Sequence, residues 1–280
     1  MNISHNKNET ILFAKMSGHG NDFIVIDNRR ENLSIDWSEK ARSWCRRRGA
    51  VGADGILLVE KSNIAAFKMR IFNADGSEAE MCGNGARCIA AFAVHQKIAR
   101  SRMTFETLAG IIEADVKDDD VFIKLTDPVE IKDGITLNTG DLELPAFFVN
   151  SGVPHTVVFK NGVKELSADE VRETGRMIRF HPLFQPEGTN VDFVEILGPG
   201  RIRVRTYERG VEEETLACGT GAVAAAIITN KFKDIGDSPV RVEMPGGTLS
   251  VTFKNKEDNF EDVWLSGKVD WIFNGEIVSH

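Results

Sequence analysis

The stretch MCGNGARCIAAF (residues 81–92) returns in altered form as ACGTGAVAAAII (residues 217–228). Both copies read Cys-Gly-polar-Gly-Ala and continue into small, apolar residues that are compatible with a helix. The copies lie about half a chain length apart, whereas the repeats of a solenoid recur every ~20–50 residues. The repeat therefore predicts two duplicated halves, each with a loop that enters a helix at a cysteine.

Around both copies, apolar and polar residues alternate as they do in half-buried β-strands. RIRVRTYERG (201–210) alternates apolar and charged residues, and AAFKMRIFNADG (65–76) predicts a strand followed by a turn. Further short runs are VFIKL (121–125), TVVFK (156–160), VDFVEIL (191–197), VRVEM (240–244) and LSVTF (249–253). Many short strands and few helices predict an α+β fold, with two pseudo-symmetric domains of barrel-like, mostly antiparallel sheet around helices. A doubly wound nucleotide-binding fold is disfavoured.

Helices outside the repeat are expected in two places. WSEKARSWCRR (37–47) and SADEVRETGRMIRF (167–180) carry helical spacing, and Ser167 is a candidate N-cap. Between Leu125 and Phe147 the sequence is polar and rich in turn residues, so we expect the change of domain there.

Charge and hydropathy narrow the class of protein. The 42 acidic residues outnumber the 34 basic ones, and the net charge of −8 disfavours nucleic acid as a partner. No apolar stretch approaches the ~20 residues of a membrane span, so no membrane partner is expected. Residues 1–10 lack the apolar segment of a secretory signal, and we expect them to be a disordered lead-in. The sequence thus predicts a cytoplasmic protein, in a compartment that keeps thiols reduced.

Four cysteines are present: Cys45, Cys82, Cys88 and Cys218. No two form a Cys-x-x-Cys pair and no histidine lies at zinc-finger spacing, so we expect no metal. Free cysteine is commonly buried in protein cores, which is a sufficient explanation for Cys45 and Cys88. The repeated motif singles out Cys82 and Cys218.

A Cys-Gly-x-Gly turn before a helix has a chemical use. Free N–H groups and the helix dipole favour anions at a helix start, and we expect them to lower the pKa of a thiol there from its ordinary value of ~8.5. The glycines let backbone N–H groups approach a carboxylate closely. Two such sites could place one thiol on each side of an α-carbon. One thiolate would remove the proton and the opposite thiol would return one, which inverts the stereocentre without a cofactor.

Several stretches together resemble the diaminopimelate epimerase family. They are SGHGNDFIVID (17–27), GADGIL (52–57), FNADGSEAEMCGNGARC (72–88), SGVPHTVVF (151–159), GTNVDFV (188–194) and YERGVEEETLACGTGA (207–222). The resemblance extends from about Ile11 to the C-terminus. It implies cofactor-independent interconversion of LL- and meso-diaminopimelate, in lysine and peptidoglycan-precursor synthesis, by an enzyme that is a homodimer.

The resemblance also implies domain bounds and roles for individual residues. The last strand returns to the first domain, so the expected halves are 11–130 plus 266–280, and 131–265. Cys82 and Cys218 become the acid–base pair, with His155 and Glu208 as accessory catalytic positions. The backbone N–H groups of Gly83, Asn84, Gly219 and Thr220 bind the reacting carboxylate. The rest of the substrate is recognised by Asn21, Asn73, Asn190, Glu208 and Arg209.

The residue types fit these roles, since Arg209 can bind a carboxylate with two hydrogen bonds and Glu208 can accept from an ammonium. Local roles are the alternative: a turn for the three asparagines and a structural histidine for His155. His19 and His181 are interpreted as structural. The family often has asparagine where this chain has Val153, and the extra carboxylates of Glu212–Glu214 are expected on the surface.

Other functions remain open from the sequence. A proline or hydroxyproline racemase would use the same two thiols, but its small cyclic substrate has no second carboxylate for Arg209. The phenazine-pathway isomerases lack the cysteine pair. A non-catalytic amino-acid-binding or redox-sensing protein could also retain both thiols.

Overall fold

The computed structural model describes residues 10–30, 35–139, 142–256 and 259–278. The expected lead-in lies outside these ranges, apart from Thr10, which begins the first strand. The chain divides into two compact units: unit 1 is Met1–Val121 with Lys268–His280, and unit 2 is Phe122–Gly267. The chain therefore changes units inside strands, after Val121 and after Gly267, whereas the bounds expected from the sequence follow residues 130 and 265.

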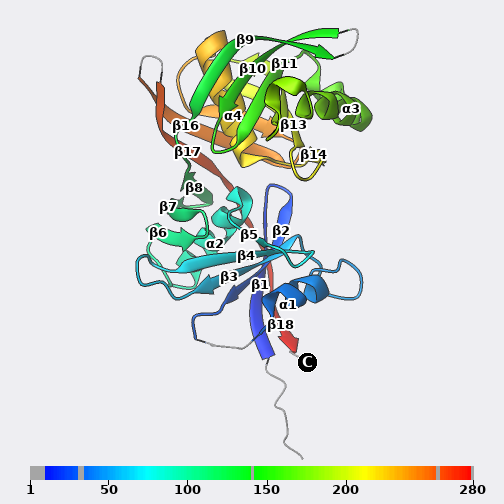
Figure 1. Ribbon diagram of the computed structural model, residues 1–280. Coiled ribbons are helices and arrows are strands. Elements are labelled where there is room, and N and C mark those ends of the chain that lie inside the picture. The colour runs from blue at the N-terminus through cyan, green and yellow to red at the C-terminus, as the bar shows by residue number, and fades with distance from the viewer. Residues whose placement is uncertain (1–9, 31–34, 140–141, 257–258, 279–280) are drawn as a thin grey trace, which may run out of the picture. The chain divides into compact units, whose positions relative to one another are not determined.

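Unit 1 is a mixed sheet with a helix at its centre (Figure 1). Strand β1 pairs antiparallel with β2 and with β18, the last strand of the chain. Strand β2 runs parallel to β3, and β4 is antiparallel to β3 and β5 and parallel to β6, which pairs antiparallel with β7. The elements are β1 (Thr10–Gly18), β2 (Asn21–Asp27), α1 (Trp37–Trp44), β3 (Gly55–Glu60), β4 (Lys68–Asn73), β5 (Glu78–Ala79), α2 (Gly83–His95), β6 (Arg102–Thr107), β7 (Gly110–Lys117), the start of β8 (Asp120–Lys124) and β18 (Asp270–Val278).

Unit 2 follows the same plan. Strand β10 pairs antiparallel with β9 and β11, β11 runs parallel to β12, and β13 is antiparallel to β12 and β14 and parallel to β15. Strand β16 is antiparallel to β15 and β17. The elements are β9 (Val129–Thr139), β10 (Leu142–Asn150), β11 (Pro154–Phe159), η1 (Val163–Glu165), α3 (Ala168–Arg179), η2 (Pro182–Phe184), β12 (Asn190–Gly198), β13 (Arg201–Glu208), β14 (Glu213–Thr215), α4 (Gly219–Lys233), β15 (Val240–Met244), β16 (Gly247–Lys256) and β17 (Asn259–Lys268).

The pairings of the two units correspond element by element. Strands β1 to β4 pair as β10 to β13 do, and α1 and α3 each lie on a parallel crossover. Helices α2 and α4 then follow short strands, β5 and β14. Strand β18 pairs antiparallel with β1, just as β9 pairs antiparallel with β10. The duplication indicated by the two cysteine motifs thus extends to the order and pairing of the strands in the two units.

The central helices explain why the repeated motif is rich in small residues. Helix α2 contacts β1, β2, β3, β4 and β7, and α4 contacts β10 to β13, β15 and β16. Residues Gly221–Thr229 of α4 are buried without interruption, which requires an apolar helix on all faces. A Cβ on Gly221 would lie 2.6 Å from Asp192 Oδ1, so the motif glycine allows the helix to approach the sheet. The α+β class and the two sheet-rich halves predicted from the sequence are confirmed.

The local predictions have mixed outcomes. Helix α3 starts at the predicted N-cap, where Ser167 Oγ accepts from Glu170 N and Glu170 Oε2 accepts from Ser167 N. Two of the five short alternating runs, VFIKL (121–125) and TVVFK (156–160), each end one residue beyond a strand, β8 and β11 respectively. The other three lie within β12, β15 and β16. The polar stretch after Leu125 was wrongly interpreted, because it forms β9 and β10. The described side chains of β9 are mostly exposed, so the strand shows little apolar alternation.

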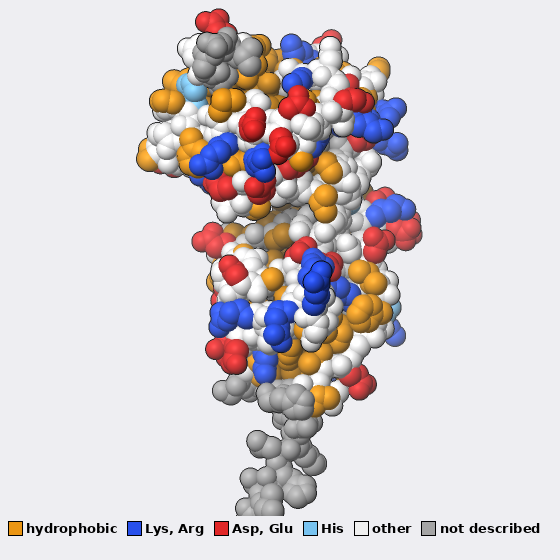
Figure 2. All heavy atoms as spheres, turned by 90° about the vertical axis from the view of Figure 1, so that its right-hand side faces the viewer, with side chains coloured by type: hydrophobic (Ala, Val, Ile, Leu, Met, Phe, Trp, Pro, Cys, Tyr) orange, Lys and Arg blue, Asp and Glu red, His pale blue; other side chains and the backbone are white. Residues whose placement is uncertain are grey.

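Two surface properties can be stated for the described ranges. Within them, no helix combines the length and the apolar character that crossing a membrane requires. On the face shown in Figure 2, acidic and basic side chains are interspersed over each unit. Many form ion pairs, such as Arg102 with Glu113 and Arg201 with Glu243.

Candidate active site

Both motif cysteines cap the central helices in the same way. Cys82 (φ −143°, ψ 120°) is the N-cap of α2, and its Sγ accepts from Gly85 N at 3.5 Å. Cys218 (φ −118°, ψ 114°) is the N-cap of α4, and its Sγ accepts from Gly221 N at 3.4 Å. The cap sulfur satisfies one N–H of the first turn, while helix geometry leaves the N–H groups that precede it without an intrahelical acceptor. Each unit therefore presents a thiol next to amide donors.

In unit 1 two of the residues predicted to bind substrate, Asn21 and Asn84, form a hydrogen-bonded chain with Asp54. Asn84 Nδ2 donates to Asn21 Oδ1 at 2.7 Å, and Asn21 Nδ2 donates to Asp54 Oδ2 at 3.0 Å. Asn21 and Asn84 are 63 positions apart in the chain and meet at the start of α2. Asn73 is exposed at the end of β4, where its Nδ2 donates to Ser77 Oγ at 3.0 Å within a turn. The structure thus gives Asn73 the local turn role and brings Asn21 and Asn84 together.

Arg87 is a feature of this half-site that the sequence did not single out. Its side chain is completely buried, and Nη2 donates to Asn84 Oδ1 at 2.6 Å and lies 3.2 Å from His19 Nδ1. Its Nε and Nη1 have no acceptor, and no carboxylate of the described residues pairs with it. Burial lowers the pKa of its guanidinium. The signal in the sequence was an arginine inside the apolar run GARCIAAF.

In unit 2 the structure connects Cys218 to His155 and to a residue outside the predicted set. Cys218 Sγ lies 3.5 Å from Thr220 Oγ1, and Thr220 Oγ1 lies 2.9 Å from His155 Nε2. His155 Nδ1 lies 2.7 Å from Asp192 Oδ2, and neither side chain is exposed. The sequence did not single out Asp192, because in the alternating run VDFVEIL it looks like an ordinary polar residue of a half-buried strand.

The electrostatics of Cys218 correct an expectation from the sequence. Burial raises the pKa of the Cys218 thiol well above its ordinary value, and the carboxylates of Glu208 and Asp192 raise it further. The hydrogen bonds from Thr220 and Gly221 lower it, but they do not outweigh burial. Burial also raises the pKa of Glu208. The expected lowering by the helix start is therefore wrong for Cys218, because its sulfur lies inside the fold beside two acids.

Asn190 and Arg209 are tied to local backbone. Asn190 is buried, its Nδ2 donates to Pro154 O at 2.9 Å, and its Oδ1 accepts from Arg209 N at 2.8 Å. Arg209 Nη1 donates to Glu187 O at 3.1 Å. Asn190 thus connects the end of β13 to the start of β11. The Arg209 guanidinium has further N–H groups that can donate to another acceptor.

The remaining cysteines are structural. Burial raises the pKa of Cys45 to about 11 and that of Cys88 to about 12. None of the four cysteines forms a disulfide in the described part of the chain. Among the described residues, no cluster of three or more His, Cys, Asp or Glu side chains has an arrangement that could hold a metal ion.

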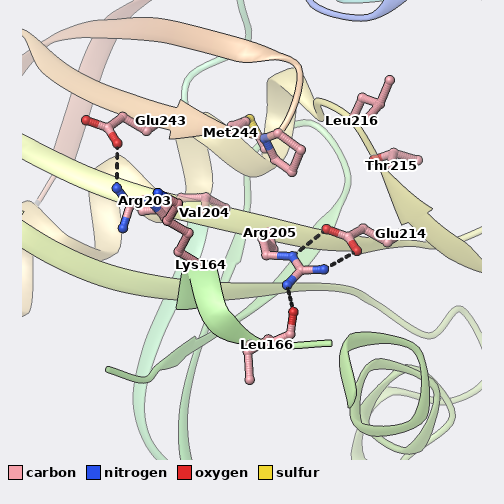
Figure 3. A pocket seen from close by; sticks show the side chains of 11 residues that line it. Lys164, Leu166, Arg203, Val204, Arg205, Glu214, Thr215, Leu216, Glu243 and Met244 are labelled. Atoms are coloured by element: carbon pink, nitrogen blue, oxygen red, sulfur yellow. Dashed lines mark hydrogen bonds and ion pairs between the residues drawn. The ribbon is translucent and has the colours of Figure 1, made fainter. Parts of the chain in front are cut away.

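A cavity of about 590 Å³ on unit 2 lies apart from this chemistry (Figure 3). Four of its charged side chains are paired: Arg205 with Glu214 at 2.6 Å and Arg203 with Glu243 at 2.8 Å. Neither cysteine of the repeated motif lines it. Glu214, which was expected at the surface, is mostly buried in this ion pair, and Glu212 pairs with Arg179. The expectation was correct for Glu213, which is exposed, and the Glu212 side chain keeps 33% of its surface exposed.

Solved structures of other proteins share this fold. One similar solved structure is a phenazine biosynthesis protein of the PhzF family from Bacillus anthracis, with a TM-score of 0.72 and 16% identity over 96% of this chain and 99% of that chain. Another is a hydroxyproline epimerase from Agrobacterium vitis, with a TM-score of 0.67 and 16% identity over 97% and 93% of the two chains. At these identities the likeness concerns the fold alone.

The sequence comparisons show the family. The family model described as "Diaminopimelate epimerase" matches residues 13–131 and 147–272. The diaminopimelate epimerase of Aquifex aeolicus is 42% identical over 277 residues, which cover 95% of this chain and 97% of that protein. The chain belongs to the diaminopimelate epimerase family, and it is an enzyme of the racemase and epimerase class.

Proposed function

We propose that this protein interconverts LL- and meso-diaminopimelate without a cofactor and that Cys82 and Cys218 are its acid–base pair. The observation that carries the proposal is the equivalent position of the two thiols, each the N-cap of the central helix of its unit. Inversion at one carbon needs a base on one face and an acid on the other. A duplicated fold with one helix-capping thiol in each copy supplies two such groups.

The backbone around each thiol suits a carboxylate. Gly83 and Asn84 begin α2, and Gly219 and Thr220 begin α4, so their N–H groups point out of the helix starts. A Cβ on Gly83 would meet no atom within 4 Å, so the space beside this residue is open. Amide donors and two helix dipoles would stabilise the enediolate that forms when the α-proton leaves.

The protonation of Cys218 assigns it a starting role. Because its pKa is raised, Cys218 is a thiol at neutral pH and begins the reaction as the proton donor. Cys82 is then the base that removes the α-proton. After one turnover Cys82 carries the proton and Cys218 is a thiolate. The two cysteines have then exchanged roles and can catalyse the reverse reaction.

The choice of diaminopimelate rests on the family and on groups suited to its distal end. Arg209 offers a guanidinium to the second carboxylate, and Glu208 offers an acceptor to the distal ammonium. We include Asn21, Asn73 and Asn190 among the residues that position the substrate, and His155 with Glu208 as accessory groups. Val153 contributes no side-chain hydrogen bond there.

The cellular role follows from the substrate. We propose that the enzyme serves lysine and peptidoglycan-precursor synthesis in the cytoplasm as a homodimer. Four cysteines that form no disulfide among the described residues fit a reducing compartment. Light scattering on the purified protein tests the dimer.

Solvent deuterium incorporation tests the activity. In D2O the protein should exchange the α-proton of diaminopimelate, and Cys82→Ala or Cys218→Ala should each abolish net inversion. Cys45→Ala is the matched control, because it removes a buried thiol outside the motif and should keep inversion. Exchange of proline in place of diaminopimelate would favour the racemase alternative. Absence of exchange with both would favour a binding or redox-sensing protein.

A further inference from the structure

The Asp54 carboxylate lies next to Asn21, at the start of β2. Its Oδ2 accepts from Asn21 Nδ2 at 3.0 Å and from Asp22 N at 3.1 Å, and its Oδ1 accepts from Arg47 Nη2 at 2.6 Å. The backbone of Asp54 is also fixed: its N–H donates to Asp22 O at 2.8 Å, and its carbonyl oxygen accepts from Ala74 N at 3.0 Å. The carboxylate therefore has a fixed place between the start of β2 and the end of β4.

The Asn21 side chain is held at both of its polar atoms. Its Nδ2 donates to Asp54, while its Oδ1 accepts from Asn84 Nδ2 at 2.7 Å. The terminal torsion of an asparagine side chain has only broad preferences, so a single hydrogen bond leaves the amide plane free to turn. Two hydrogen bonds at opposite atoms fix that plane. The amide of Asn21 is thus ordered before a ligand arrives, which reduces the entropy that binding must overcome.

Arg87 sets which way round the two amides lie. A guanidinium only donates, so the atom of Asn84 that faces Arg87 Nη2 at 2.6 Å is its oxygen. Asn84 then turns its nitrogen to Asn21, which accepts through its oxygen. The nitrogen of Asn21 is left to face Asp54, and an ionised carboxylate can only accept. The cation at one end and the anion at the other therefore impose the same orientation on both amides.

One N–H group of Asn21 remains for a ligand. The side-chain NH2 group carries two protons, and Asp54 accepts one of them. Because the amide plane is fixed, the second proton has a fixed direction. Asn21 also contacts Asn84, the second residue of α2, whose backbone N–H is proposed above to bind the reacting carboxylate. An amide turned the other way would present its oxygen to a carboxylate and repel it, so the orientation decides whether Asn21 attracts the substrate.

Unit 2 differs from unit 1 at these positions. Asn21 ends the turn SGHGN, and His155 ends the corresponding turn SGVPH. In the parallel pairings of β2 with β3 and of β11 with β12, Asp54 corresponds to Val191, whose side chain is apolar. The amide that a carboxylate holds in place is therefore a property of unit 1.

We propose that Asp54 is a positioning residue of the epimerase site. Together with Asn84, it holds the Asn21 amide so that the remaining N–H of Asn21 donates to a carboxylate of the substrate. This assignment rests on the function proposed above. Asp54 does not contact the substrate and acts only through Asn21, which separates its role from that of a residue that simply stabilises the fold.

A double-mutant cycle between Asp54 and Asn21 tests the proposal. In the wild-type background, Asp54→Ala should weaken the binding of diaminopimelate about tenfold, because the Asn21 amide is free to turn. In the Asn21→Ala background the same change should have no further effect, since the group through which Asp54 acts is gone. Isothermal titration calorimetry measures the four dissociation constants. Equal effects of Asp54→Ala in both backgrounds, or no effect in the wild-type background, would overturn the proposal.

Two carboxylate-to-amide substitutions serve as controls. Asp54→Asn can keep an oxygen towards Asn21 Nδ2 and Asp22 N, so it should recover most of the affinity that Asp54→Ala loses. Asp27→Asn, at the other end of β2, removes a carboxylate that is also paired with an arginine, Arg29 at 2.8 Å, and should leave binding unchanged. Thermal melting shows whether each variant is folded. An Asp54→Asn variant as weak as Asp54→Ala would contradict the proposal, because the negative charge and not the held amide would then matter.

A second readout needs no substrate. Nitrogen-15 relaxation of the Asn21 side-chain amide, whose signal is identified by its loss in Asn21→Ala, reports motion on the picosecond-to-nanosecond timescale. We expect a rigid amide in the wild type and in Asp54→Asn, and a mobile one in Asp54→Ala. This pattern in a protein that neither binds nor epimerises diaminopimelate would remove the proposed function and retain Asp54 as the residue that positions Asn21. Equal mobility in the wild type and Asp54→Ala would overturn the positioning role, even if the wild type epimerises diaminopimelate.

Discussion

Arg87 Nη2 donates to Asn84 Oδ1 at 2.6 Å, while Nε and Nη1 of the same guanidinium have no acceptor among the described residues. A buried charge without a carboxylate partner destabilises a fold. Asn84 is the second residue of α2, beside the N–H groups proposed to bind the reacting carboxylate. We therefore expect the charge of Arg87 to interact with the carboxylate of a bound substrate.

Arg87→Met should separate stability from binding. Methionine fills similar space without the charge, so we expect the free energy of unfolding to stay equal or to rise. Binding of diaminopimelate should weaken about tenfold, which corresponds to ~1.4 kcal/mol. Thermal denaturation and calorimetry measure the two effects, and Arg87→Lys serves as the charge-retaining control. A large fall in stability with unchanged affinity would show that Arg87 is structural.

Glu208→Gln should make Cys218 more reactive. The carboxylate of Glu208 raises the pKa of Cys218, so its neutral replacement lowers that pKa and increases the thiolate fraction at any pH below it. We expect faster alkylation of Cys218 at pH 8, together with slower epimerisation because an acceptor for the substrate is lost. Glu213→Gln, which changes an exposed carboxylate, should leave alkylation unchanged. Slower alkylation in Glu208→Gln would contradict this electrostatic interpretation.

Cys45 and Cys88 should resist modification in the folded protein. With pKa values raised to about 11 and about 12 by burial, both remain thiols at pH 8. Iodoacetamide should label them only after denaturation, because the thiolate is the reactive form. Peptide mass spectrometry before and after addition of guanidinium chloride checks this expectation, and labelling of either residue in the native protein would contradict it.

Two glycines of the repeated motif should respond differently to alanine. At Gly221 a Cβ would lie 2.6 Å from Asp192 Oδ1, and we expect Gly221→Ala to cost ~1–3 kcal/mol of stability. At Gly83 a Cβ would meet nothing within 4 Å, so Gly83→Ala should leave stability unchanged or slightly raised. Its methyl group would project beside Cys82, and epimerisation should fall. Denaturant unfolding and activity assays distinguish the pair, and equal destabilisation by both would contradict the packing described here.

Much of the fold could be predicted from local patterns. The period-2 runs located strands such as β15, and Ser167 located the start of α3, because both signals arise from neighbours in the chain. Strand β9 escaped prediction, since an exposed strand has no apolar face to reveal it. The boundary between the units also escaped, because it falls inside β8 and β17, where the local pattern does not change.

The sequence by itself determined that two cysteines begin two equivalent helices and that the chain belongs with the diaminopimelate epimerases, because both follow from short motifs and their order in the chain. Only the tertiary structure decided that Asp192 meets His155, that Arg87 is buried without a carboxylate, and that the pKa of Cys218 is raised. These properties depend on burial and on contacts between distant residues. A helix start lowers the pKa of a thiol when the sulfur is accessible to solvent; inside the fold, desolvation and two nearby carboxylates outweigh it.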